Sequence, residues 1–92
     1  MEKITNLSQT AELMSSDNYK DRFIAEYLQI EIRTRRLERV IKSVEDNTCP
    51  KCFTPSCDIA VLKSQFKTMN AYRATLAFRA AIEDIELPEV DV

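Results

Sequence analysis

The chain has 92 residues, of which 45% are hydrophobic and 30% are charged, and its formal net charge is −2. This length suits one small domain, and no apolar run approaches the roughly 18–20 residues that cross a bilayer. The first residues lack a basic segment followed by an apolar one, so no secretory signal is predicted. Three cysteines, an odd number, disfavour a complete disulfide framework and favour a reducing cytoplasm.

The first 15 residues are predicted to form an N-terminal segment with a short helix over residues 5–14. Thr5 or Asn6 would cap it. A helix of this length needs tertiary support, because fewer than about 12–15 residues rarely stay helical alone. Ser15, Ser16 and Asp17 then offer side-chain oxygens that can cap a following helix.

A long helix is predicted over residues 17–45, which contain neither proline nor glycine. Apolar residues recur in steps of three and four, with Thr34 filling one gap: Tyr19, Phe23, Tyr27, Ile30, Leu37, Ile41 and Val44. This spacing places them on one face of a helix. A second apolar line runs beside the first: Ile24, Leu28, Ile32 and Val40.

A connector over residues 46–57 separates this helix from a second one, predicted over residues 58–87. Pro50 and Pro55 keep the connector from being helical. Ser56, Cys57 or Asp58 is expected to cap the second helix, and Pro88 to stop it. The second helix has its own apolar stripe: Ile59, Leu62, Phe66, Met69, Tyr72 or Arg73, Leu76 and Ala80. Residues 88–92 form an acidic tail.

These elements predict an all-α fold, an antiparallel hairpin of two long helices with a short N-terminal helix. The first long helix carries more apolar surface than one partner helix can cover. We therefore expect a homo-oligomeric helical bundle, with the second apolar line at the interface. The alternative is that the N-terminal helix folds back and covers that line. Association is favoured, because a two-helix core of this size rarely stands alone.

The three cysteines lie close together in the connector and suggest a metal site. Cys49 and Cys52 are three residues apart on a predicted turn, and Cys57 follows. Thiolates with this spacing can hold one tetrahedral zinc ion, but a structural site usually has four protein ligands. Asp58 or a cysteine from another subunit would have to be the fourth. Free thiols in a loop between helices are the favoured alternative.

Enzymatic activity is not expected. The chain has no histidine and no glycine, so neither a Ser–His or Cys–His pair nor a glycine-rich phosphate loop can be built. Carboxylate pairs on helix surfaces are more often solubilising charge than an acid and a base. Apart from the possible zinc ion, no cofactor is predicted.

Polar residues follow the edge of the apolar face on both helices. On the first they are Arg22, Glu26, Gln29, Arg33 and Arg36, and on the second Gln65, Thr68, Tyr72, Thr75 and Arg79. They could form an interhelical network, with Glu26 paired to Arg22 or Arg33. They could also line a pocket in which arginines hold phosphate and tyrosines stack on a base. Tyr19 and Lys20, near free N–H groups at the helix start, are further candidates.

Nucleic acid is not expected as a partner on this sequence, although several basic residues lie close together. Arg33, Arg35, Arg36 and Arg39 point in different directions around a helix. The sequence pI of about 5.1 is also far from the usual basic footprint of such proteins.

The helical segments resemble a family of small proteins of tailed phages first named from crAss-like phages, over residues 16–82. The resemblance rests on the run from Tyr19 to Tyr27 and on spaced residues beyond it: Gln29, Arg33, Leu37, Leu62, Gln65, Met69, Tyr72, Leu76 and Arg79. The cysteine-rich connector is not part of this pattern. The resemblance implies a phage or prophage origin and a cytoplasmic location in the infected host cell.

Small oligomeric helical phage proteins include sponges that sequester the nucleotide messengers of bacterial immunity. By analogy, we expect a protein that binds an anionic nucleotide ligand, such as a cyclic oligonucleotide or a cyclic ADP-ribose derivative. The expected ligand-binding residues are Tyr19, Lys20, Arg22, Glu26, Tyr27, Arg33, Arg36, Tyr72 and Arg79. The alternative is a module that binds a host or phage protein through the exposed part of the first long helix.

Overall fold

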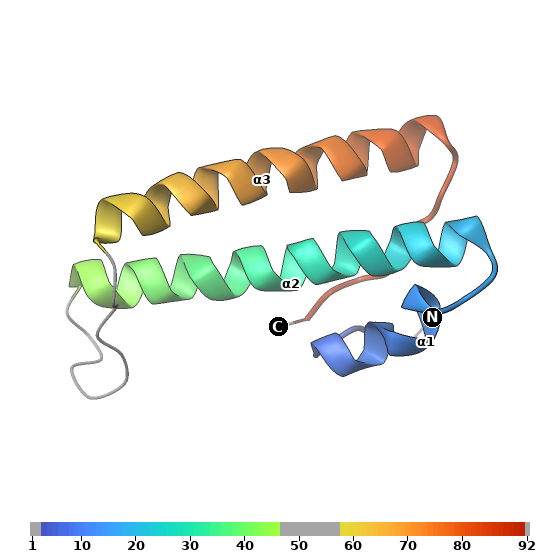
Figure 1. Ribbon diagram of the computed structural model, residues 1–92, viewed down its shortest axis with the longest axis horizontal. Helices are drawn as coiled ribbons and strands as arrows, with labels where there is room; N and C mark the ends of the chain where they lie inside the picture. Colours follow the sequence, from blue (N-terminus) through green and yellow to red (C-terminus); the bar gives the residue numbers. More distant parts are fainter. Residues whose placement is uncertain (1–2, 47–57, 92) are drawn as a thin grey trace.

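The computed structural model describes residues 3–46 and 58–91, which are mostly helical, as expected. A 3₁₀ turn, η1 (Leu7–Thr10), leads into the short helix α1 (Ala11–Met14). Two long helices follow, α2 (Tyr19–Asp46) and α3 (Ile59–Ile82), and they run side by side in opposite directions (Figure 1). None of the helices in these residues combines the length and the apolar character that crossing a membrane requires.

Helix α2 starts two residues later than predicted, because its cap is Asn18. The Asn18 side chain accepts a hydrogen bond from the Lys20 N–H, at 2.9 Å. Ser16 supports this cap, since its hydroxyl accepts from the Asn18 N–H and donates to the Asp21 carboxylate. Ser16, one of the residues predicted to cap the helix, therefore supports the capping residue Asn18 and is not the cap itself. The helix continues to Asp46, one residue beyond the predicted end.

Helix α3 ends at Ile82, so the prediction that it reaches Leu87 was wrong. Asp84 adopts a left-handed backbone conformation with φ of 57°. The Ile85 N–H then donates to the Ala80 carbonyl, at 2.9 Å. This bond, from a residue to the carbonyl five positions before it, is typical of the Schellman motif at a helix end. Ala80 and Ile85 are both buried in the core, as that motif favours. The start of α3 lies close to the predicted one. The helix begins at Ile59, and the Asp58 side chain accepts a hydrogen bond from the Ala60 N–H.

The apolar stripe predicted on α3 contributes residues to the core between α2 and α3. Leu76 and Ala80 are buried in the cluster that also contains Phe23 of α2. The sequence left open whether Tyr72 or Arg73 belongs to this stripe. Arg73 turns toward α2, whereas Tyr72 is exposed.

The N-terminal segment and the C-terminal tail cover the second apolar line of α2. Figure 1 shows both running along α2 on the side away from α3. A parallel bridge joins Ile4 to Val90. The core cluster on this side combines residues of all three segments: Ile4, Leu7, Leu13, Ile24, Leu28, Ile32, Ile85, Leu87 and Val90. The structure thus agrees with the alternative in which the N-terminal segment folds back. The expectation that this line forms a subunit interface was wrong.

Apolar surface remains exposed on α3 instead. Phe78 and Ile82 have 68% and 67% of their surface exposed, and Val61 is also exposed. Helix α3 contains no acidic residue. A helix with apolar residues around most of its circumference is usually covered by a neighbour.

Candidate functional site: a basic pocket around Glu31

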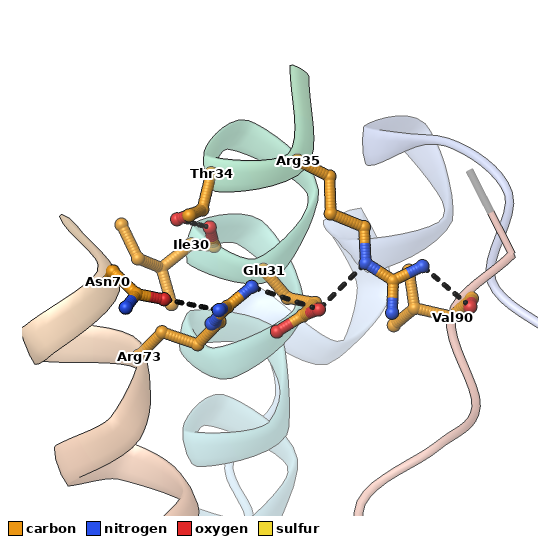
Figure 2. A network of polar contacts seen from close by, with 7 residues as sticks. All are labelled: Ile30, Glu31, Thr34, Arg35, Asn70, Arg73 and Val90. Atoms are coloured by element: carbon orange, nitrogen blue, oxygen red, sulfur yellow. Dashed lines mark hydrogen bonds and ion pairs between the residues drawn. The ribbon is translucent and has the colours of Figure 1, made fainter. Parts of the chain in front are cut away.

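The carboxylate of Glu31, in the middle of α2, is a buried acidic group that two arginines contact. The Glu31 side chain is 7% exposed, and it accepts from Arg35 Nε at 2.7 Å and from Arg73 Nη1 at 3.4 Å. Figure 2 shows the two guanidinium groups approaching it from opposite sides, Arg73 from α3 and Arg35 from the next turn of α2. Both positive charges are therefore held in place by one buried negative charge.

Each arginine has a further partner that fixes its position. Arg35 Nη1 donates to the backbone carbonyl of Val90 in the tail, at 3.0 Å. Arg73 Nη2 donates to the Asn70 side chain on its own helix (Figure 2). The network thus connects α3, α2 and the C-terminal tail, and it fixes the orientation of both guanidinium groups.

A pocket of about 390 Å³ opens beside this network. Its lining comes from α2 and α3: Glu31, Arg35, Glu38, Arg39, Lys42 and Arg73. Four of these side chains are cationic and two are carboxylates, which leaves a surplus of two positive charges. Lys42 contacts Glu38 at 3.2 Å, but 70% of its side chain is exposed. The pocket has the size of small-molecule sites and the charge to hold an anion.

The polar stripe predicted on the first long helix does not reach this pocket. Arg22, Glu26, Arg33 and Arg36 are exposed, on the side of α2 away from the pocket lining. Arg22 donates to the Ser16 carbonyl at 2.8 Å. Within residues 3–46 and 58–91, no ion pair joins Glu26 to Arg22 or Arg33, so the expected interhelical network is not formed.

Tyr19 and Arg79, both predicted to bind ligand, contact each other where α2 begins and α3 ends. The Tyr19 hydroxyl donates to Glu83 Oε1 and accepts from Arg79 Nη2, both at 2.8 Å. Arg79 also pairs with Glu83 and lies over the Phe23 ring, 4.9 Å from its centre. The hydrogen bond to Glu83 is the main cause of a raised Tyr19 pKa. This cluster fastens the two helix ends together.

The remaining predicted ligand-binding residues lie apart from one another. Lys20 is exposed in the first turn of α2, and Tyr72 is exposed on α3. Tyr27 is half-buried and packs against the core cluster. Burial raises the Tyr27 pKa, and the nearby Glu31 carboxylate adds to the rise. The structure therefore does not gather the predicted residues into one site.

All six residues that line the pocket were missing from the predicted site. The sequence does hold a signal for part of it, because Glu31 and Arg35, and Glu38 and Lys42, are acidic and basic residues four positions apart. Such pairs are common on helix surfaces, and nothing in their spacing shows that Glu31 is buried. The position of Arg73 within an apolar stripe was the more specific sign that a charge is directed at the neighbouring helix.

The cysteines proposed as metal ligands, Cys49, Cys52 and Cys57, lie outside the described residues. Within residues 3–46 and 58–91, no group of three or more acidic or other ligating side chains is arranged to hold a metal ion.

Comparison with known families gives a match, whereas comparisons with curated proteins and with solved structures give none. The matching family model is described as Sequestin, and it aligns with residues 17–82. These residues include α2, α3 and every residue that lines the pocket, but neither the N-terminal segment nor the C-terminal tail. The alignment covers well over half of the chain, and the chain therefore belongs to the Sequestin family.

Proposed function

We propose that the protein is a non-enzymatic binding protein that sequesters a phosphate-bearing nucleotide messenger in the pocket around Glu31. The messenger is of the cyclic oligonucleotide or cyclic ADP-ribose type, and its removal blocks the anti-phage defence of an infected cell. The observation that carries the proposal is the surplus of cationic side chains in a pocket between two helices. The family name is consistent with a sequestering function.

The four cations of the pocket suit different roles toward a phosphate group. Arg35 and Arg73 are bound to Glu31 and supply a fixed positive wall. Lys42 is mostly exposed and can turn toward a ligand, because its contact with Glu38 is a surface ion pair. Arg39 lines the same opening. A lysine ammonium and an arginine guanidinium each give a phosphate charge-assisted hydrogen bonds, and the arginine fork makes these bonds directional.

The proposal is tested by calorimetric titration with cyclic dinucleotides, cyclic trinucleotides and cyclic ADP-ribose. One member of this panel is expected to bind and, at 100 times its Kd, to stabilise the fold by about 2.7 kcal/mol. Arg39→Ala or Lys42→Ala should weaken binding about tenfold or more, because a hydrogen bond to a charged group contributes about 1.5–3 kcal/mol. No saturable binding by any member would contradict the proposal.

Two further variants locate the site. Lys67→Ala removes an exposed lysine of α3 that does not line the pocket, so the affinity should stay the same. Arg36→Ala tests the stripe that the sequence suggested, on another side of α2. If Arg36→Ala weakened binding and Lys42→Ala did not, the ligand would lie on that exposed face and the pocket would be the wrong site.

The proposal includes self-association through the exposed apolar side of α3. Phe78, Ile82 and Val61 project from a helix that has no acidic residue. Acidic residues follow directly at its end, Glu83 and Asp84, whereas Lys63 and Lys67 lie near its start. Two copies of α3 packed antiparallel would bring opposite charges together at both ends, as a two-fold interface requires.

Light scattering with size-exclusion chromatography tests this association. The protein is expected to elute as a dimer or a higher symmetric oligomer, and Phe78→Glu should yield a monomer with unchanged helicity. A monomeric wild-type protein that copurifies with a defined protein through Phe78 would instead support the alternative function, a protein-interaction module. The exposed apolar surface of α3 would serve this alternative, as would the exposed part of the first long helix that the sequence suggested.

A further inference from the structure

A second pocket of about 400 Å³ continues the basic pocket along the same two helices. It is lined by Glu38, Ile41, Lys42, Glu45, Lys63 and Phe66. Glu38 and Lys42 line both pockets, so the two openings are neighbours along one groove between α2 and α3. The chemistry of the walls changes from one to the other. The first pocket has only charged side chains, whereas the second has the buried Ile41 and the half-buried Phe66 at its wall.

We infer that this second pocket holds the planar heteroaromatic base of the ligand whose phosphate occupies the basic pocket. The inference rests on the proposed function and adds the class of chemical group that lies next to the phosphate. Phe66 offers an aromatic face that a base can stack on, and Ile41 offers an apolar wall beside it. Lys42, shared by both pockets, lies at the junction where base and phosphate meet.

The open rim of the second pocket carries a hydrogen-bond donor and an acceptor, both of which the edge of a base can bind. Lys63 Nζ lies 2.7 Å from Glu45 Oε1, and this ion pair spans from α3 to α2. Both side chains are about half exposed, so they remain available to a ligand. The edge of a base carries both hydrogen-bond donors and acceptors, and an ammonium beside a carboxylate can bind to both. The hydrocarbon chain of a lipid would form no hydrogen bonds with this rim.

The test compares ADP with inorganic pyrophosphate by calorimetric titration at one ionic strength. The two probes share a diphosphate, and only ADP carries a base. Wild-type protein is expected to bind ADP about tenfold or more tightly than pyrophosphate, which is the usual contribution of one stacked base. Phe66→Leu, which keeps an apolar side chain but loses the ring, should remove most of this difference while the Kd for pyrophosphate stays within twofold.

Two control variants make the result specific to the ring of Phe66. Phe78→Leu is the same substitution on the same helix at an exposed position outside the groove, and it should change neither Kd. Phe66→Tyr retains an aromatic face and should retain the preference for ADP. Thermal unfolding of each variant shows whether the fold is intact.

The outcomes separate this inference from the proposed function. If pyrophosphate binds, Lys42→Ala weakens it and ADP gains nothing, the base subsite is wrong and the phosphate pocket stands. If Phe66→Leu weakens both probes equally, the subsite is also overturned, because the ring then supports the fold and not the base. If neither probe binds the wild-type protein, the phosphate pocket and the base subsite both fail.

Discussion

Arg73 of α3 reaches across to Glu31 of α2, with 3.4 Å between Arg73 Nη1 and Glu31 Oε1. Arg35 approaches the same oxygen from the other side, at 2.7 Å. One buried carboxylate therefore joins two helices and holds two cations that would otherwise repel each other.

Removal of the Glu31 charge should destabilise the protein. Glu31→Gln leaves two neighbouring arginines without their anion, and we expect the free energy of unfolding to fall by about 1–3 kcal/mol. Urea denaturation measures this change. The matched control is Glu38→Gln, whose partner Lys42 is mostly exposed, so the loss should stay below about 1 kcal/mol. Equal losses would show that burial of Glu31 contributes little.

Ile4→Ala tests whether the N-terminal segment belongs to the core. Ile4 is 6% exposed and contacts the cluster on α2. Truncation should lower the free energy of unfolding by about 2 kcal/mol or more, because a cavity remains where the side chain packed. Ile82→Ala, the same change at an exposed position, should cost less than about 0.5 kcal/mol when both variants are measured in the monomeric Phe78→Glu background. Similar effects of the two variants would mean that the segment does not pack on α2.

Asp84 ends α3 in a conformation that glycine adopts more readily. With φ of 57°, the backbone is left-handed, and the side chain makes that conformation less favourable. Asp84→Gly is expected to raise the free energy of unfolding by about 0.5–1 kcal/mol. Thermal unfolding measures the gain, and Asp91→Gly in the tail should show none. A lower melting temperature for Asp84→Gly would indicate that the carboxylate itself caps the helix.

Stability should fall at alkaline pH, because the pKa values of Tyr19 and Tyr27 are raised in the folded protein. A raised pKa means that the folded state holds the phenol proton more tightly than the unfolded chain. The resulting stability is fully present below the unfolded pKa of about 10 and is lost as pH rises through the folded value. Tyr27→Phe should flatten the decline in melting temperature above pH 10. An identical decline in wild type and variant would refute this origin.

The helices could be predicted from sequence because their spacing and caps are local. The apolar steps of α2, the absence of glycine and proline, and the cap at Asp58 depend only on neighbouring residues. The end of α3 was missed because a non-glycine residue takes the left-handed position and Pro88 lies further on. The pocket was missed because it depends on Arg73 meeting Glu31 across 42 positions of sequence, which no local pattern shows.

Arg35 binds the tail through the backbone carbonyl of Val90 and not through a side chain. Every amino acid has this acceptor, so the contact places no demand on which side chain stands at position 90. Relatives can therefore vary the tail sequence at this point and keep the connection to Glu31 and Arg73. Replacement of Arg35, in contrast, would remove three things together: the hydrogen bond to the tail, the ion pair with Glu31 and one cationic side chain of the pocket lining.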